Sequence, residues 1–524
     1  MLRDNPSPLG SVAPPGLETV LMRCLRKNPA DRFQEMREVR AALESLRTPT
    51  QAVSAQTMQV AVARTEASIA VLPFANLSAD KENEYFSDGL AEEIINALTH
   101  VRGLKVTART SAFAFRGENQ DIRKIAETLN VRTILEGSVR RAGSRIRVSA
   151  QLINAADGYH LWSERYDAEM ADVFAVQDEI ASAIAGALKL KLSAELTDAR
   201  RHVPTLPAFE ALLKGRHLQF DGTPQGLERS KEYFESAIAL DPEYALAHAA
   251  LASYFWSLAF NGLRPAREVM QPARVEALKA LELDPSLPEA LAALGVGTAA
   301  YDYDWKESER WFKLAMGGDS VPASVRWCYA FYYLMPYGRL HEAVKELERT
   351  VEEDPLNMGM RIALINGLHT AGRDDRAIAE AEKILKIDEN RWNVYLALGR
   401  IYAHRGQFAE ALAAAEKAYQ LASWNSRVTA LFGGVLMLSG EHRRAKEVVE
   451  KLAESGDAYG TPMALAVYHA MCAETEAAAD CFQKAIEQRD PSVIGYLRTP
   501  VMKILQSSPR WPALAKQMNL PELA

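Results

Sequence analysis

Cysteine is scarce in this sequence, and the few cysteines are poorly spaced for cross-linking or metal binding. The 524 residues include Cys24, Cys328, Cys472 and Cys481, with no C-x-x-C pair. A disulfide scaffold or a zinc finger needs cysteines at short, regular spacings. A chain of this length can build several hydrophobic cores without cross-links. We therefore expect no disulfide framework and no zinc site, and a reducing compartment suits the composition.

Long hydrophobic runs and a strong charge excess are also missing. No uninterrupted apolar stretch of about 18 residues occurs, and the polar residues 1–6 precede no apolar signal-peptide core. The 61 basic and 68 acidic residues give a net charge of −7, which provides no general attraction to nucleic acid or to an anionic membrane. We expect a cytoplasmic protein with no membrane segment and no nucleic-acid partner.

Motifs for catalysis and cofactor binding are absent as well. Neither G-x-S-x-G nor a Walker-type loop occurs, and His341-Glu342 has Lys345 where a zinc protease has its second histidine. Residues 295–300 read GVGTAA and formally match a dinucleotide fingerprint. That fingerprint requires a preceding strand, whereas this one lies in a helical pattern. We expect no catalytic residue, no cofactor and no metal.

Three composition regimes divide the rest of the chain. Residues 48–67 are small and polar, without aromatics, and are expected to form a linker. Residues 68–200 alternate strand-like and helix-like patterns, and residues 205–524 are alanine-rich and helical throughout. The fold class is therefore multidomain: a short helical N-terminal fragment, an α/β domain with a mixed sheet, and an all-α region.

Turn residues recur in the helical region at a nearly constant spacing. They are Asp241-Pro242, Asp284-Pro285, Asp319-Ser320, Asp354-Pro355, Asp388-Glu389 and Ser423-Trp424. Their successive separations are 43, 35, 35, 34 and 35 residues, and a period near 34 with two helices per unit is the tetratricopeptide spacing. The longer first gap is expected to loop out at residues 261–265. We predict a right-handed solenoid of about eight units over residues 205–524.

One unit carries the repeat pattern most clearly. Its marker residues are Tyr395, Leu398, Gly399, Tyr402, Gly406, Phe408, Ala411, Ala415 and Ala418. This unit closely resembles the tetratricopeptide repeat. Small residues such as Gly399 allow two helices to approach, while Tyr395 and Leu398 fill the seam between them.

The segment before the repeats has the pattern of a mixed sheet. Apolar runs predict strands, and Ser87 or Asp88 and Asp121 are candidate caps of helices. An amphipathic helix is expected from Asp172 onward. The expected strands cover residues 69–73, 104–108, 133–140, 145–152 and 160–166. Strings such as SIAVLPFANLSADKENEYFSDGLAEEI and LEGSVRRAGSRIRVSAQLINAADGYHLWSERYD resemble the TolB amino-terminal-like domain of bacterial signalling proteins. That resemblance implies a non-catalytic accessory domain.

The first 47 residues resemble the carboxy-terminal end of a protein serine/threonine kinase domain. The similarity lies in two short helical patterns joined by Asn28-Pro29-Ala30-Asp31-Arg32-Phe33. The Gly-rich loop, strand lysine, His-Arg-Asp loop and Asp-Phe-Gly segment of such kinases do not occur in this chain. The resemblance implies a remnant, and phosphotransfer by this chain alone is not expected.

Binding is expected in the concave groove of the repeats. In such arrays the first helix of each unit lines the groove. Projecting the family's groove positions onto this chain gives Asn366, His369, Asn393, Arg400, His404 and Arg427. Asparagine can bond a peptide backbone, and arginine can bind a carboxylate with two hydrogen bonds. The expected partner is a protein or peptide, with an acidic or free carboxyl end.

The sequence thus predicts a non-catalytic protein-interaction scaffold in bacterial signalling. The alternative is the regulatory half of a serine/threonine kinase whose catalytic part lies elsewhere. A third hypothesis, a transcription regulator or cyclase partner, would need a helix-turn-helix or a cyclase catalytic segment, and neither pattern occurs.

Overall fold

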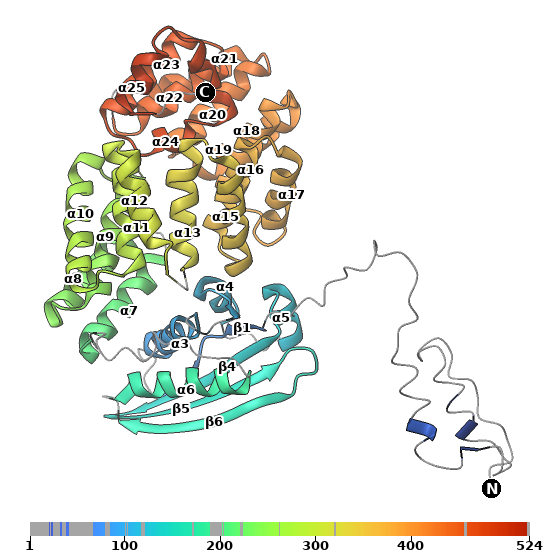
Figure 1. Cartoon of the computed structure of the whole chain (residues 1–524). Helices are drawn as coiled ribbons and strands as arrows, with labels where there is room; N and C mark the ends of the chain where they lie inside the picture. The colour runs from blue at the N-terminus through green and yellow to red at the C-terminus, as the bar shows by residue number, and fades with distance from the viewer. Residues whose placement is uncertain are drawn as a thin grey trace. The chain divides into compact units, whose positions relative to one another are not determined.

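In the computed structural model, residues 67–188 form an α/β domain on a mixed sheet (Figure 1). The strands are β1 (Ala67–Val71), β2 (Ala75–Asn76), β3 (Leu104–Val106), β4 (Thr133–Ala142), β5 (Arg145–Asn154) and β6 (His160–Glu169). Their order is β3-β1-β4-β5-β6, with β2 against β4. β1 pairs in parallel with β3 and β4, whereas β4, β5 and β6 are antiparallel. The mixed sheet predicted from the sequence is confirmed.

Helices cover both faces of this sheet. They are α3 (Glu84–Thr99), α4 (Arg109–Phe113), α5 (Ile122–Leu129) and α6 (Val173–Ala187). Ile69 and Val71 of β1 share one buried cluster with α3 and α6. Ala70 and Leu72, which point to the opposite face, pack against α5. β1, the strand with helices over both faces, is accordingly almost entirely apolar.

Two details of this domain differ from the sequence-based expectation. α3 begins at Glu84, so Ser87 and Asp88 lie inside the helix and are buried rather than capping it. The Asp88 carboxylate instead pairs with Arg116, a contact that local sequence does not reveal. The short helix α4 was not expected. The predicted cap of α5 is confirmed, because the Asp121 side chain accepts a hydrogen bond from Arg123 N at 3.0 Å.

The region from residue 204 to residue 520 is a solenoid of helical hairpins. Within its described residues the helices pair as α7 (Leu206–Phe220) with α8 (Pro224–Leu240), α9 (Ala245–Phe260) with α10 (Ala266–Leu283), α11 (Pro288–Gly297) with α12 (Trp305–Ala315), α13 (Ala323–Tyr329) with α15 (Leu340–Glu353), α16 (Met358–Thr370) with α17 (Asp374–Leu385), α18 (Trp392–His404) with α19 (Phe408–Ala422), α20 (Ser426–Leu438) with α21 (His442–Ala453), and α22 (Thr461–Met471) with α23 (Thr475–Glu487). The all-α solenoid is confirmed.

Two first helices of the hairpins end in π-helical turns. η6 (Thr298–Asp302) continues α11, and η7 (Ala330–Leu334) continues α13 into α14 (Met335–Tyr337). The GVGTAA string therefore lies in a helix, as predicted. Its first glycine, Gly295, lies against the Phe312 ring of α12, where an ideal Cβ would come within 2.8 Å of a ring carbon. Close helix packing explains this glycine without a nucleotide.

Gly399 in α18 illustrates how small residues set the spacing between units. An ideal Cβ there would lie 2.9 Å from Leu431 Cδ2, and Leu431 is itself buried. We expect Gly399→Ala to destabilise the fold by about 1 kcal/mol, because the overlap outweighs the gain in helix propensity. Gly186→Ala in α6 is the control, since nothing lies within 4 Å of an added Cβ. Urea unfolding should show opposite signs for the two variants, and equal stabilisation would contradict the packing argument.

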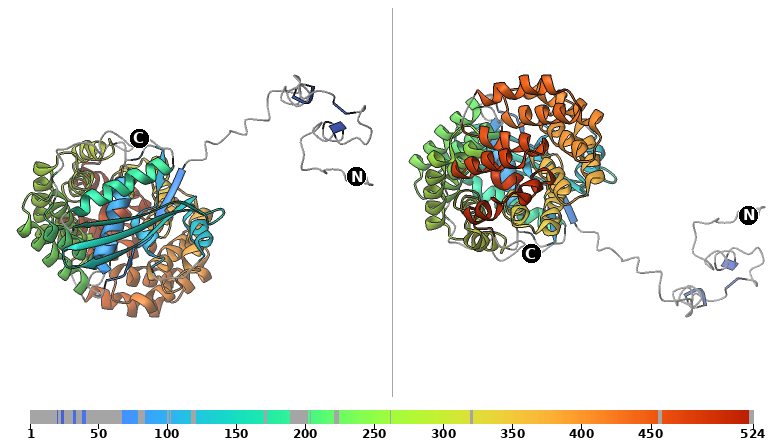
Figure 2. Two further views of the ribbon diagram at one scale, coloured as in Figure 1. Left: turned by 90° about the horizontal axis from the view of Figure 1, so that it is seen from below. Right: turned by 90° about the horizontal axis from the view of Figure 1, so that it is seen from above.

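The solenoid curves until its two ends meet. Tyr459 Oη, just before α22, donates a hydrogen bond to the Ala259 carbonyl of α9 at 3.3 Å. The Arg267 guanidinium of α10 donates to the Glu487 carbonyl of α23. Figure 2 (right) shows the last helices, in red, inside the curve of green to orange helices. The concave side is therefore partly filled by the chain itself.

The filling segment follows the last hairpin. It comprises α24 (Ser492–Tyr496), the 3₁₀ helix η8 (Pro500–Ser507) and α25 (Trp511–Gln517). Trp305 Nε1 of α12 donates to the Met518 carbonyl at 2.8 Å, and Arg498 Nε donates to the Pro336 carbonyl at 2.9 Å. Tyr496 and Met518 are buried in the cluster that also holds Phe312 and Tyr333. This C-terminal segment is part of the solenoid's core.

The α/β domain and the solenoid pack together within residues 66–524. Glu92 of α3 forms ion pairs with Arg109 at 3.1 Å and with Arg216 of α7 at 2.9 Å. α3 and α7 approach closely at Gly89, because an ideal Cβ there would overlap Leu213 of α7. A second contact joins the Ala108 amide to the Glu353 carbonyl at 2.8 Å. The two parts predicted as separate domains therefore share two interfaces.

Asp354, at the predicted Asp-Pro turn, is the centre of the second interface. Its Oδ1 accepts hydrogen bonds from Ser111 N at 3.0 Å and from Ser111 Oγ at 2.5 Å. Its Oδ2 accepts one from Asn357 Nδ2 at 2.8 Å. Burial raises the pKa of Asp354, and these hydrogen bonds oppose the rise. The turn that ends one repeat thus holds α4 of the α/β domain.

The structure describes residues 67–78, 84–99, 101, 103–116, 121–169, 172–188, 202, 204–220, 224–260, 262–318, 321–454 and 458–520. It also describes 20, 23–24, 32–33 and 38–40, which belong to a separate unit over residues 1–65. In that unit the Arg23 guanidinium lies 4.2 Å from the centre of the Phe33 ring. Most of the predicted kinase-end fragment (1–47) and nearly all of the linker (48–67) lie outside the described residues.

Candidate binding surface

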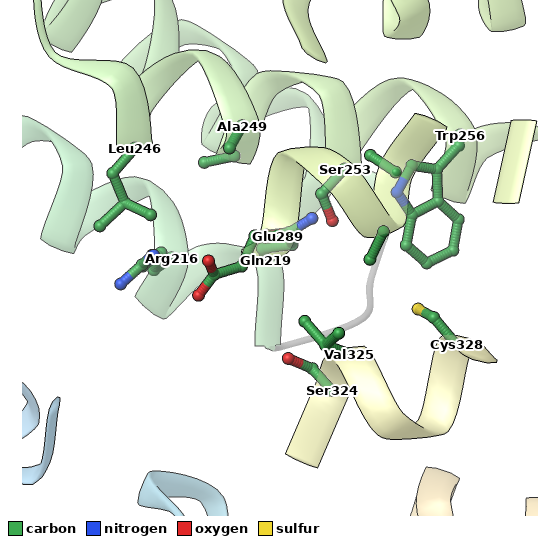
Figure 3. A pocket seen from close by; sticks show the side chains of 13 residues that line it. Arg216, Gln219, Leu246, Ala249, Ser253, Trp256, Glu289, Ser324, Val325 and Cys328 are labelled. Carbon is green, nitrogen blue, oxygen red and sulfur yellow. The ribbon is translucent and has the colours of Figure 1, made fainter. Parts of the chain in front are cut away.

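A hollow lies on the concave side of the first four hairpins (Figure 3). Its volume is about 140 Å³, and its walls come from α7, α9, α11 and α13, the first helix of each hairpin. Small side chains, including Ala249, Ala250, Ala292 and Ala293, leave this space open. The surface therefore has the position expected of a repeat groove, although in other units than those the sequence pointed to.

Polar groups lie at the ends of this hollow. Arg216 and Glu289 line it, and Arg216 is already held by Glu92 of the α/β domain. Trp256 forms an aromatic wall opposite Cys328. Burial raises the pKa of the Cys328 thiol to about 12, so this cysteine is not a thiolate nucleophile at neutral pH. The hollow offers recognition groups rather than a reactive one.

Contacts in the structure join four of the six predicted groove residues, Asn366 with Arg400 and His369 with His404. Asn366 and His369 lie on α16, and Asn393, Arg400 and His404 lie on α18. Arg400 Nη2 donates to Asn366 Oδ1 at 2.6 Å. The rings of His369 and His404 are 5.6 Å apart between centres. Asn393 Oδ1 is buried without a hydrogen-bond partner.

His369 belongs to the core as much as to the groove. It is 4% exposed, and its Nδ1 lies 2.8 Å from Asp374 Oδ1. Burial lowers its pKa to about 4, helped by the nearby charge of Arg400 and opposed by Asp374. The imidazole is therefore neutral at pH 7 and donates to the Asp374 carboxylate.

The chain's own C-terminal segment covers Arg400. Its guanidinium lies 5.3 Å from the centre of the Tyr496 ring of α24. The neighbouring Gly495 approaches the Phe331 ring of η7, where an ideal Cβ would lie 3.9 Å from a ring carbon. A partner at these positions would meet α24 first, so their role as partner contacts stays a prediction.

Arg427 is the predicted residue on the next first helix of the array. It sits at the start of α20, in a second and larger cavity next to Tyr459 and Asp490. The sequence analysis missed the rest of that cavity, and it missed Arg216, Trp256 and Tyr496. Trp256 was detectable as an aromatic on a first helix, but Tyr496 follows the last repeat, where no period marks it.

Ion pairs occupy much of the basic β4–β5 hairpin. Arg141, Arg145 and Arg147 pair with Glu210, Glu169 and Asp167, respectively. Arg145 and Arg147 share one face of the hairpin, and Arg141, which is opposite Ile146, lies on the other. Carboxylates of β6 and α7 thus pair with arginines on both faces. Among the described helices, none is both long enough and apolar enough to cross a bilayer.

Two family models match parts of the chain. Residues 65–183 match the model described as "HilA/YgeH-like transcriptional regulator, second domain", and residues 393–423 match the tetratricopeptide repeat model. The second match covers the unit that the sequence pattern singled out. The chain therefore contains a tetratricopeptide repeat, whereas neither match names the TolB or kinase families that the sequence resembles.

Curated relatives share parts of this chain. "Putative adenylate cyclase 3" of Rhizobium meliloti (strain 1021) is 46% identical over 190 residues, which are 35% of this chain and 32% of the relative. "Transcriptional regulator HilA" of Salmonella typhimurium is 24% identical over 317 residues, 59% of this chain and 55% of the relative. The chain thus spans about a third of the first relative's length and about half of the second's.

Three solved structures are similar to parts of this chain at low sequence identity. Pseudomonas aeruginosa pilF is 21% identical with a TM-score of 0.34, and the match covers 44% of this chain and 98% of the pilF chain. YrrB, titled "a TPR protein with an unusual peptide-binding site", is 22% identical with a TM-score of 0.27, covering 36% and 91%. Yeast Tom70 is 15% identical with a TM-score of 0.37, covering 84% and 85%.

Proposed function

We propose that this protein is a non-catalytic interaction scaffold of bacterial signalling that binds a segment of a partner protein on its concave side. The observation that carries the proposal is the hollow lined in turn by α7, α9, α11 and α13. Successive first helices of stacked repeats form an extended surface for a peptide or a helix. Because their packing is rigid, the ordering entropy of binding falls mainly on the partner.

The composition of the hollow supports a peptide ligand. Alanines leave room for a backbone, Trp256 offers an aromatic face, and Ser253 and Ser324 offer hydroxyl groups for hydrogen bonds. The expected acidic or free carboxyl end of the partner is a separate proposal that rests on Arg400. To bind such an end, the guanidinium would first have to break its hydrogen bond to Asn366 and move away from the Tyr496 ring.

A second candidate function is the regulatory arm of an output domain on the same polypeptide. It is favoured by the similarity to parts of a protein named as a putative cyclase and of a transcription regulator. The regulatory half of a serine/threonine kinase is the sequence-based alternative, and it depends on residues 1–47. In each case the TolB-like α/β domain, docked through Glu92 and Asp354, would transmit the binding state of the repeats.

The proposal predicts that filling the hollow blocks binding. Ala293 is half-buried in its wall, so Ala293→Trp should lower the affinity for a bound peptide at least about tenfold. Val275→Trp on the outer face of α10, where Val275 is 61% exposed, is the control and should bind like the wild type. The measurement is calorimetric titration with peptides selected from a displayed library on the full chain.

Two results would contradict this function. One is equal affinity of both tryptophan variants for the selected peptides. The other is a selection in which no peptide binds the full chain. Circular dichroism of both variants would show that each is folded, so that a loss of affinity in Ala293→Trp reports on the hollow itself.

A further inference from the structure

The larger cavity lies where the two ends of the solenoid meet. It has a volume of about 490 Å³. Phe260, Gly262 and Leu263 come from the end of α9 and the loop after it, whereas Lys451, Leu452, Tyr459, Asp490 and Ser492 come from the last two hairpins and the start of α24. The remaining wall is the turn between α19 and α20, from Ser423 to Thr429. The cavity thus exists only because the curve closes.

Two cationic side chains, those of Arg427 and Lys451, belong to its lining. Neither Arg427 nor Lys451 forms a side-chain hydrogen bond or ion pair within the described residues. Arg427 is half-buried, and its positive charge opposes the rise that burial causes in the pKa of Tyr332 and of Asp490. Half-buried guanidinium groups in proteins are usually paired. An unpaired guanidinium facing a cavity is therefore a ready anion contact.

Asp490 is the single carboxylate among the described lining residues. Its Oδ1 accepts hydrogen bonds from Ser492 N at 2.9 Å and from Ser492 Oγ at 2.7 Å. Burial raises its pKa, and the hydrogen bonds from Ser492 and the charge of Arg427 oppose that rise. Even when Asp490 is ionised, Arg427 and Lys451 outnumber it two to one. The described lining therefore carries an excess of positive charge.

Helix ends add to this excess. α20 and α22 both begin at the cavity, and an ideal Cβ on Gly460, the residue before α22, would lie 4.0 Å from Ser426 Oγ of α20. Both helix starts present partial positive charge. The hydroxyl groups of Ser423, Ser426 and Thr461 supply further donors, whereas that of Thr429 donates to the Ser423 and Asn425 carbonyls.

Another part of the lining is apolar and aromatic. Phe260, Leu263, Tyr419, Leu452 and Tyr459 line the cavity, and Trp424 stands at it with 72% of its surface exposed. A bare inorganic ion would leave most of this surface without contact. A ligand that fits has one anionic group and a flat or apolar body.

We propose that this cavity binds a small organic anion, either a carboxylate or a phosphate monoester with an aromatic or apolar body, whose charged group contacts Arg427 and Lys451. The site is separate from the hollow assigned to a partner segment, so either proposal can fail alone. A bound ligand would contact α9 at one end of the solenoid and α20 to α24 at the other. Binding would therefore stabilise the closed form.

The test is the binding of three probes to the full-length chain: phenyl phosphate, hippurate and the neutral analogue benzamide. Thermal unfolding and calorimetric titration at low salt should show binding of at least one anion and not of benzamide. Arg427→Gln should weaken that binding about tenfold or more, because a charge-assisted contact is lost. Circular dichroism should show that this variant is folded, since within the described residues the Arg427 side chain forms no hydrogen bond or ion pair.

Arg443→Gln is the matched control, because it removes the same charge from α21 at a position whose side chain is 91% exposed. It should bind the anion like the wild type. Binding of phenyl phosphate alone would identify the ligand as a phosphate ester, and binding of hippurate alone as a carboxylate. Absence of binding of either anion at millimolar concentration, or equal loss in Arg427→Gln and Arg443→Gln, would overturn the proposal.

Discussion

Replacing Asp354 by alanine is expected to destabilise the fold by about 3 kcal/mol and to loosen the α/β domain from the repeats. The variant would leave Ser111 N, Ser111 Oγ and Asn357 Nδ2 without the carboxylate that they share. Buried donors without an acceptor cost more than the hydrogen bonds themselves contribute. Urea unfolding measures the loss, and hydrogen exchange of the α4 amides should speed up.

Asp284 provides the matched control for that experiment. It occupies the corresponding Asp-Pro turn two hairpins earlier and caps its own turn, with Ser286 N at 3.0 Å and Ser286 Oγ at 2.7 Å. Asp284→Ala removes the hydrogen bonds within a repeat turn, but among the described residues it removes no contact to the α/β domain. Equal losses for the two variants would mean that Asp354 acts only within its turn.

A second large effect is expected from pH. The pKa of His369 is held near 4 in the folded chain, against an ordinary value of 6.5. Between these values the unfolded chain binds a proton that the folded chain refuses, so stability falls as the pH drops from 7 towards 4. A shift of this size corresponds to about 3 kcal/mol, fully lost below pH 4.

His369→Asn should remove most of this pH dependence. Asparagine still donates to Asp374 but does not titrate. Urea unfolding at pH 7, 6, 5 and 4 would measure how the free energy of unfolding changes with pH, in the wild type and in His369→Asn. His442→Asn on the exposed start of α21 is the control and should follow the wild type. A wild-type slope retained in His369→Asn would show that other groups set the acid sensitivity.

The repeat architecture was predictable because its signal is periodic. Turns about 34 residues apart and glycine at 399 fix helix length and helix spacing locally, and the sheet follows from apolar runs between turn residues. The α5 cap at Asp121 is equally local. The predicted start of α3 was wrong. Asp88 pairs with Arg116 instead of capping the helix, and that contact depends on tertiary structure.

The candidate site was predictable only in part for the same reason. Sequence spacing placed Asn366 and Arg400 on equivalent faces, and the structure joins them at 2.6 Å. It could not show that Tyr496 covers Arg400, because α24 lies beyond the last repeat. Nor could it show the cavity around Arg427, since its walls are brought together by small rotations summed over many hairpins.

The meeting of α9 and α10 with α22 and α23 has a consequence for how such a chain can evolve. In an open array each unit contacts only its neighbours, so units can be duplicated or deleted with little harm. Here the contacts of Tyr459 with Ala259 and of Arg267 with Glu487 require the last hairpin to return to the second. Adding or removing one repeat unit would displace these contacting residues from one another by the length of a hairpin. Geometry therefore fixes the number of repeats.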